Sequence, residues 1–332
     1  MMMRISKKQG GMSLVELMVA ITLSLILTLG IIQIFSSSKQ TGRVQEALAR
    51  LQENARFTLD ILSRDLRMAG QLGCNSNADV RNSSDGQLDN SALGGLFGYE
   101  WSDTLAVALT GSNATPDAGT VVDNTDVIVV MAAGTGSVPA TSNGTTIDAV
   151  VDDLAVGDPA IISDCESADV FVVDAVDTTN GTTTAIQALS KDYAAGAELA
   201  PLHYTAYYLR VDDGERHLYR TYVNGISASA GISSDPLLSG IEDLQILYGE
   251  TQNDGTIRYV AADAAGLDME RVTSLRLHLL LATEEDNLAT TPQTYWFYDP
   301  DTNAVAEHTA TDRRLYRSFT TTIQLRNQGL GT

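Results

Sequence analysis

The longest uninterrupted hydrophobic segment of the chain lies near its N-terminus, in residues 12–35. It reads MSLVELMVAITLSLILTLGIIQIF, and its only charged residue is Glu16. An α-helix of this length would extend roughly 36 Å, which is enough to cross a hydrocarbon core of about 30 Å. The pattern therefore predicts a membrane-spanning helix.

The residues before this segment are basic, with Arg4, Lys7 and Lys8 among the first eleven. Basic residues favour the cytoplasmic side of a membrane, so we expect the body of the chain on the outer side of the inner membrane. An ordinary secretory signal has an apolar region of about 7–15 residues followed by small residues at a cleavage site. The longer segment found here favours retention, and removal at Ser36–Ser38 is the less favoured alternative.

A helical pattern continues through residues 36–70. Apolar residues recur at steps of three and four along one face, which is the spacing of an amphipathic helix. They are Val44, Leu48, Leu51, Ala55, Leu59, Leu62, Leu66 and Ala69. We expect this stripe to cover a sheet of the same protein, and a coiled-coil dimer is the alternative.

Glycines mark the weak points and the end of this helical region. Gly30 and Gly42 each cost about 1 kcal/mol relative to alanine inside a helix, so we expect bending or local melting there. Gly70 and Gly73 are typical of a helix end.

The rest of the chain has the pattern of β-structure. Residues 71–200 contain short apolar runs between turn formers, namely TLAVALT, DVIVVMAA, PAIIS and VFVVDAV. Residues 201–332 are more regular: TAYYLRV and ERHLYRTYV flank Asp212-Asp213-Gly214, which is typical of a hairpin. Four leucines alternate on one face of a later strand, listed as Leu275, Leu277, Leu279 and Leu281. With IEDLQILYG and LYRSFTTTIQLRN, these runs predict an α+β protein whose long helix packs on a mainly antiparallel sheet.

Charge divides the chain further. The formal net charge is −21, and residues 71–200 contain Arg81 and Lys191 as their only bases. A surface this negative repels phosphate, so direct nucleic-acid binding is not expected. The acidic segment could attract calcium, but it lacks the ordered ligand spacing of a calcium loop. A solvated acidic face is the simpler interpretation.

The two cysteines of the chain are Cys74 and Cys165. Two cysteines in an extracytoplasmic chain predict a single disulfide. Two free thiols or a metal pair are the alternatives, and two distant sulfur atoms without a nearby histidine are too few ligands for zinc.

No catalytic motif, metal centre or cofactor site is apparent in the sequence. The histidines are scattered and are expected on solvent-facing strands or loops; they are His203, His217, His278 and His308. The chain lacks the metalloprotease, nucleophile-elbow and phosphate-loop motifs, so we expect no enzyme activity. Arg313, Arg314 and Arg317 could hold an anion, but they more plausibly balance nearby acids or contact a neighbouring subunit.

Glu16 needs an explanation because an ionised group inside a bilayer is unfavourable by about 2.5–3.5 kcal/mol. It could simply lie near one end and reach the headgroups. Cleavage after Gly11 offers another explanation, since Met12 would then carry a positive α-amino group four residues before Glu16. The carboxylate would gain an ammonium partner on its own chain or on an adjacent one.

Gly11 followed by MSLVELMVA resembles the class III leader of type IV prepilins and type II secretion pseudopilins. The resemblance implies that residues 1–11 are a leader, that prepilin peptidase cuts after Gly11 and that the amine of Met12 is methylated. It also implies that Glu16 guides docking into a filament. Met12 departs from the commoner phenylalanine, which leaves the degree of methylation open. Cleavage would leave 18 bases against 42 acids.

Three further segments resemble the PilW family of minor pilins: QENARFTLDILSRDLRMAGQLGC, GIEDLQILYG and RRLYRSFTTTIQLRN. The resemblance covers both ends of the chain and hardly the acidic middle. It implies a pilin-like fold. Together with the apolar pattern and the charge distribution, it divides the chain into 1–11, 12–35, 36–70, 71–200 and 201–332. It also implies a role in starting and supporting type IV pilus assembly with other minor and major pilins and a tip adhesin. The protein would wait in the inner membrane and then enter the pilus.

Two other functions remain open at this point. A type II secretion pseudopilin would have a similar shape. A membrane-anchored periplasmic module that binds cations or another ligand through its acidic loops belongs to a different class.

Overall fold

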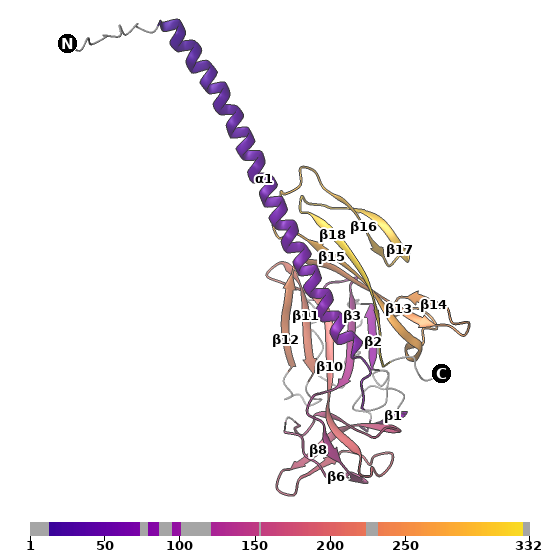
Figure 1. Ribbon diagram of the computed structural model, residues 1–332. Helices are drawn as coiled ribbons and strands as arrows, with labels where there is room; N and C mark the ends of the chain where they lie inside the picture. Colours follow the sequence, from indigo (N-terminus) through magenta and orange to yellow (C-terminus); the bar gives the residue numbers. More distant parts are fainter. Residues whose placement is uncertain are drawn as a thin grey trace, which may run out of the picture. The chain divides into compact units, whose positions relative to one another are not determined.

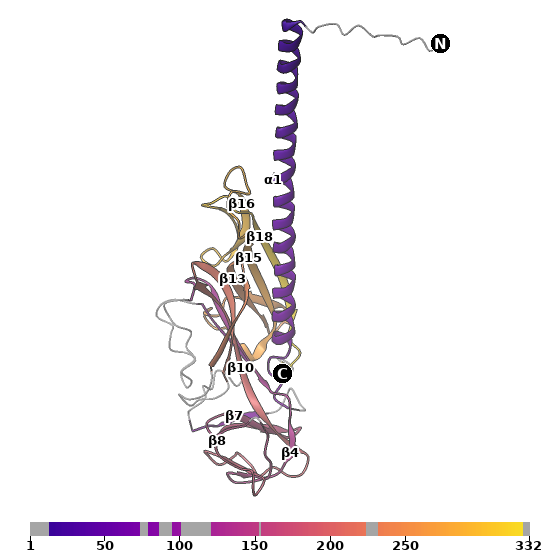
Figure 2. The same cartoon turned by 90° about the vertical axis from the view of Figure 1, so that its left-hand side faces the viewer.

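A computed structural model describes residues 13–73, 79–85, 95–100, 121–152, 154–223 and 232–327. The chain forms two compact units, Met1–Arg50 and Leu51–Thr332. The described part of the first unit is helical. The second unit contains the rest of the same helix and the β-strands (Figures 1 and 2).

One continuous helix, α1, spans Leu14–Arg67 and has 54 residues. It joins the two helical segments that the sequence predicts. Gly30 and Gly42 are both helical, so the expected local melting is wrong. A Cβ atom added at either glycine would meet nothing within 4 Å, so no close packing requires glycine there. A cost of about 1 kcal/mol for each glycine does not interrupt the backbone hydrogen bonds of a helix of 54 residues.

The end of α1 confirms the glycine signal. Gly70 has a φ of 72°, a left-handed conformation that favours glycine just after a helix. Its N–H donates to the carbonyl of Met131 at 3.0 Å, which joins the helix end to a strand.

The apolar stripe of α1 is buried from Leu51 onwards. Leu51, Ala55, Leu62 and Leu66 are at most 3% exposed and belong to one hydrophobic cluster with side chains from both major sheets. Full burial of a leucine side chain stabilises a fold by about 1.5–3 kcal/mol. The prediction that this stripe covers the protein's own β-structure is therefore confirmed for the second unit.

The larger sheet contains twelve strands and is built around one long strand, β10 (Ala197–Asp212). One end of β10 pairs with β3 and β11, and the other end pairs with β4 and β7. The remaining strands extend these pairings. Their bounds are β1 Asp79–Ser83, β2 Leu96–Glu100, β3 Asp126–Ala133, β4 Val138–Ala140, β5 Ser142–Asn143, β6 Thr146–Ile147, β7 Pro159–Ser163, β8 Ser167–Asp177, β9 Thr182–Ala185, β11 Glu215–Val223 and β12 Ile232–Ser239.

A second sheet has four antiparallel strands in the order β14, β13, β15, β18 (Figure 1). Their bounds are β13 Ile241–Thr251, β14 Ile257–Val260, β15 Val272–Ala282 and β18 Tyr316–Gln324, with a short 3₁₀ helix at Met269–Arg271. The strands β16 Thr294–Asp299 and β17 Ala304–Thr309 form a separate hairpin. The four leucines of β15 predicted to face a core are at most 1% exposed, which confirms the alternation.

The hairpin between β10 and β11 also forms as predicted. Asp212 pairs with Glu215, so the loop consists of Asp213 and Gly214 alone. Both loop residues have positive φ angles, 50° and 83°. This is the type I′ geometry that matches the twist of the two strands.

Three features differ from the predictions or lie beyond them. β1 pairs with β8 in parallel, whereas the other named strands of the described chain pair antiparallel. His278 was expected at the surface but is 6% exposed, because the β16–β17 hairpin covers it and Tyr298 stacks on its ring at 5.0 Å. The predicted strand TLAVALT lies outside the described residues.

Candidate functional site

The first turn of α1 is capped by its own side chains. The Oγ of Ser13 accepts a hydrogen bond from the N–H of Val15 at 3.3 Å. The Oε2 of Glu16 accepts one from the N–H of Ser13 at 3.4 Å. A serine with a glutamate three residues later is a capping box, which satisfies N–H groups that have no partner inside the helix.

Glu16 is therefore held against the start of its own helix. The positive end of the helix dipole stabilises a negative charge at this place. The carboxylate is also exposed in this chain, so it is accessible to a positive group from the same chain or another. Sequence reasoning missed Ser13, although the Ser-x-x-Glu pattern before an apolar run is a signal that would have found it.

Two predicted site residues lie just before this turn. Gly11 and Met12 are outside the described residues. Cleavage after Gly11, methylation of Met12 and the meeting of an amine with Glu16 remain predictions.

The surface that follows Glu16 is apolar and uncovered. Large hydrophobic side chains from Leu14 to Phe35 are between 47% and 73% exposed. Within the described residues, α1 is the one helix long and apolar enough to cross a membrane, with a mean hydropathy of 2.4 and none of that window buried. This agrees with the predicted membrane-spanning segment.

The hydroxyl groups on this surface are already bonded within the helix. Thr22 Oγ1 donates to the carbonyl of Val19 at 2.9 Å, and Thr28 Oγ1 donates to that of Ser24 at 2.7 Å. Ser24 Oγ donates to the carbonyl of Ile21 at 3.0 Å. Hydroxyl groups satisfied in this way suit an environment without water.

The predicted disulfide lies partly outside the described residues. Cys165 is in the turn between β7 and β8, whereas Cys74 is not described. The pairing therefore stays a prediction.

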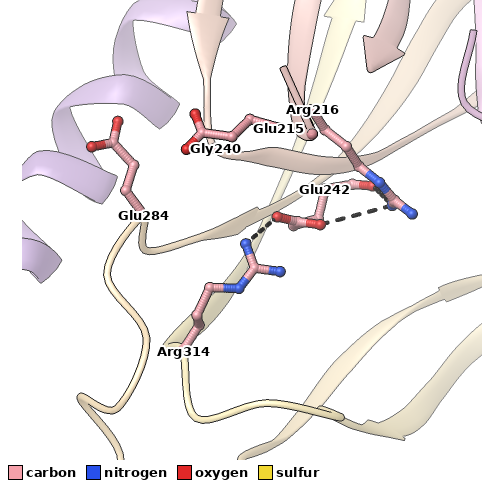
Figure 3. A pocket seen from close by; sticks show the side chains of 7 residues that line it. Glu215, Arg216, Gly240, Glu242, Glu284 and Arg314 are labelled. Atoms are coloured by element: carbon pink, nitrogen blue, oxygen red, sulfur yellow. Dashed lines mark hydrogen bonds and ion pairs between the residues drawn. The ribbon is translucent and has the colours of Figure 1, made fainter. Parts of the chain in front are cut away.

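A second candidate site is a polar cleft of about 310 Å³ between the β10–β11 turn and the start of β13. Arg314 donates from Nη1 to Glu242 at 2.5 Å and from Nε to Asp312 at 2.7 Å. Arg216 also donates to the backbone carbonyl of Glu242 at 2.5 Å. Figure 3 shows Glu242 between the two arginines.

These contacts explain the charge of Arg314. Burial opposes its positive charge, but hydrogen bonds to Glu242 and Asp312 outweigh that effect and raise the pKa of the guanidinium. Arg314 thus balances nearby acids, as the sequence suggested, and its donors are directed at protein carboxylates rather than at a bound anion. Among the described residues, no group of three or more His, Cys, Asp or Glu side chains is placed to hold a metal ion.

Comparisons with known proteins concern both ends of the chain. Residues 206–327 match the family model Type IV Pilus-assembly protein W, and residues 6–32 match the Prokaryotic N-terminal methylation motif. No curated protein matches the chain. A type IV-like pilin from Thermus thermophilus is similar at 14% identity and a TM-score of 0.32, with 84% of this chain and 96% of that chain covered. That structural likeness is too weak to support a conclusion about function.

Proposed function

We propose that the chain is a minor pilin that primes and supports type IV pilus assembly, because residues 206–327 match the PilW family model and residues 6–32 match the N-terminal methylation motif. The observation that carries the proposal is the start of α1. A capped helix end with an accessible carboxylate is followed by an apolar surface that the described chain leaves uncovered.

The apolar surface supports a subunit that waits in the inner membrane. The C-terminal domain would then lie on the periplasmic side, since the bases precede the helix. The helix leaves the lipid only when it can bury the same surface among other pilin helices. Lipid and pilin helices are both apolar, so this exchange contributes little hydrophobic free energy. Packing between helices and polar contacts therefore decide whether the subunit leaves the lipid.

Processing supplies the polar contact. Prepilin peptidase cuts after Gly11 and leaves a positive amine on Met12. The carboxylate of Glu16 accepts a hydrogen bond from this amine, which belongs to its own chain or to a neighbouring subunit. This bond replaces the one from the N–H of Ser13 or forms beside it. An ion pair of this kind is favoured where water is excluded, because an unpaired carboxylate there is costly.

Other minor and major pilins are the expected partners, and a tip adhesin fits a subunit that starts the filament. The family match is to pilus assembly and therefore does not favour the secretion pseudopilin alternative. Loss of twitching with normal exoprotein release would separate the two functions.

Glu16→Ala tests the assembly step. We expect the variant to be processed normally but to enter pili poorly, because no carboxylate meets the amine. Pili are isolated by shearing, and the incorporated fraction is measured by immunoblot. Glu46→Ala is the matched control, since Glu46 is an exposed acid on the same helix that pairs with Arg50 at 2.8 Å. Undiminished incorporation of Glu16→Ala would contradict the proposal.

Gly11→Ala tests the processing step separately. We expect the leader to stay attached, which an intact-mass measurement of the purified protein detects. Normal piliation by a protein that keeps its first eleven residues would overturn the proposed mechanism.

A further inference from the structure

The two sheets of the second unit are joined by side chains that bond to backbone. The Oδ2 of Asp126, at the start of β3, accepts a hydrogen bond from the N–H of Ile246 in β13 at 2.5 Å. The Nε2 of Gln245 donates to the carbonyl of Asn124 at 2.7 Å. These two contacts cross from the larger sheet to the smaller one, so Asp126 is part of the joint between them.

Asp126 lies directly opposite another acid. It pairs in register with Glu100, the last residue of β2, and the two side chains are on the same face of the sheet. Asp126 is 1% exposed, and its carboxyl group lies close enough to that of Glu100 to affect its pKa. An ionised carboxylate only accepts hydrogen bonds, so the two groups can bond to each other only when one of them keeps its proton.

The geometry indicates which oxygen carries this proton. Asp126 Oδ2 is occupied by the N–H of Ile246, and no donor from the described residues reaches Oδ1. A protonated Oδ1 is itself a donor and needs no other, whereas a buried ionised oxygen without a donor is costly. Asp126 is also the more buried of the two acids, and burial raises its pKa well above the usual value.

Among the described residues, the charged side chains that act most strongly on the pair are other acids. Asp243 of β13 acts on Asp126, and Asp263, after β14, acts on Glu100; both raise the pKa of their neighbour. The phenols of Tyr248 in β13 and Tyr298 in β16 also lie near both acids, and Tyr99 of β2 lies near Tyr248. Burial also raises the pKa of Asp243, to about 6.

The phenol of Tyr248 lies near the pair, and burial together with the two carboxyl groups raises its pKa. Its side chain is fully buried, and a Cβ atom on Gly98 would lie 1.6 Å from its hydroxyl oxygen. Only glycine at position 98 leaves room for this ring.

We propose that the proton shared by Asp126 and Glu100 is a pH-sensitive latch that fastens the end of β2 to the joint between the two sheets. When the proton is lost, two buried negative charges face each other. Glu100, which is only half-buried, is the group that moves away. The latch is built into the β-domain and does not depend on the proposed role in assembly.

The direction of the pH effect follows from linkage. A carboxyl group whose pKa is raised by folding keeps its proton in the native state after the unfolded chain has released it. Stability is then complete below the unfolded pKa and falls as the pH rises toward the folded pKa. For one proton in a domain of this size, the expected fall in Tm is roughly 3–5 °C per pH unit.

Asp126→Asn is the decisive variant. Its amide oxygen can still accept from Ile246, and its NH₂ group replaces the shared proton as a donor to Glu100. We expect the full-length protein in detergent to lose the decline in Tm that the wild type shows from pH 7 to 9, above the range in which Asp243 titrates. Glu250→Gln is the control, because Glu250 is a buried acid that pairs instead with Arg258 at 2.7 Å. This control should keep the wild-type slope in the same pH range.

Infrared spectroscopy tests the proton directly and does not depend on variant stability. The wild type at neutral pH should show the C=O stretch of a protonated carboxyl group, and Asp126→Asn should lack that band. Glu100→Gln should retain the band, because the protonated Oδ1 of Asp126 can still donate to the introduced amide oxygen. No such band in the wild type, or parallel Tm profiles for the wild type and Asp126→Asn, would overturn the latch.

Discussion

The two parts of α1 have the same backbone conformation but differ in where their apolar side chains lie. From Leu14 to Phe35 the helix is apolar on every side, and its large side chains are exposed. From Leu51 to Leu66 it is apolar along one stripe, and that stripe is buried in a core shared with both sheets. The first part needs a membrane or other helices to cover its apolar side chains, whereas the second part is covered by the β-sheets of the same chain.

This difference shows that one helix contributes to the stability of the β-domain through its second part and to the proposed membrane anchoring and assembly through its first part. Changes in the second part act on folding of the β-domain. Changes in the first part act on the environment that the helix enters, with little effect on the β-domain.

The largest effect is expected from Leu62→Ala. Leu62 is fully buried, so the variant should lose about 2–5 kcal/mol of unfolding free energy through lost burial and a cavity. Urea unfolding of the full chain in detergent, followed by fluorescence, measures this loss. Leu27→Ala, at a position that is 67% exposed, is the control and should leave the midpoint unchanged. Equal losses in both variants would break the comparison between the two parts.

A smaller effect is expected where the helix bonds to the sheet. The phenol of Tyr207, which is fully buried, donates to the carboxylate of Asp65. Asp65→Ala should cost about 1–3 kcal/mol because the buried hydroxyl loses its partner. Asp60→Ala removes an exposed pair with Arg64 on the same helix and should cost at most about 0.5 kcal/mol. Chemical unfolding of both variants distinguishes a buried anchor from a surface pair.

The β-domain should also respond to acid through His278. Burial, with a contribution from Arg276, lowers the pKa of His278 to about 4. The unfolded chain therefore binds the proton first, so this contribution is present above about pH 6.5 and is lost as the pH falls toward 4.

The expected loss between pH 7 and pH 5 is about 1–2 kcal/mol relative to a His278→Asn variant. Urea midpoints at each pH measure it, and His217→Asn in β11 is the control. A wild-type profile parallel to that of His278→Asn would show that His278 does not titrate on unfolding.

The smallest effect is expected at the start of α1. Ser13→Ala removes the cap on the Val15 N–H and should weaken the first turn by about 1 kcal/mol, with no change in the β-domain. Amide hydrogen exchange in micelles should be faster at Val15. Ser24→Ala removes a hydroxyl bonded within the helix and should leave Val15 unchanged. A loss of β-domain stability in Ser13→Ala would contradict the separation of the two parts.

Local patterns were sufficient for several elements. The DVIVVMAA run became β3 with the predicted bounds, and the Asp213-Gly214 turn has the predicted geometry. Such features depend on a few neighbouring residues, whose preferred φ angles and alternation are visible in the sequence. The same holds for the apolar segment, since its length alone predicts a membrane span.

Other features depended on residues far apart in the chain. His278 lies on the outer side of β15 by alternation, but a hairpin nearly twenty residues later covers it. Asp126 and Glu100 look like two acids among many in an acidic segment. The pairing of β2 with β3 places the two carboxyl groups opposite each other, and Tyr248 packs against the same part of β2. Neither contact can be read from the linear sequence.

The sequence by itself determined where the apolar helix lies, which face of its second half is buried, and which end carries Glu16. These properties follow from periodicity and local conformational preference. Only the tertiary structure decided which polar groups were withdrawn from water and which partners they met there. Burial changes the energy of a charge by its surroundings, and those surroundings come from strands and loops that the linear order keeps apart.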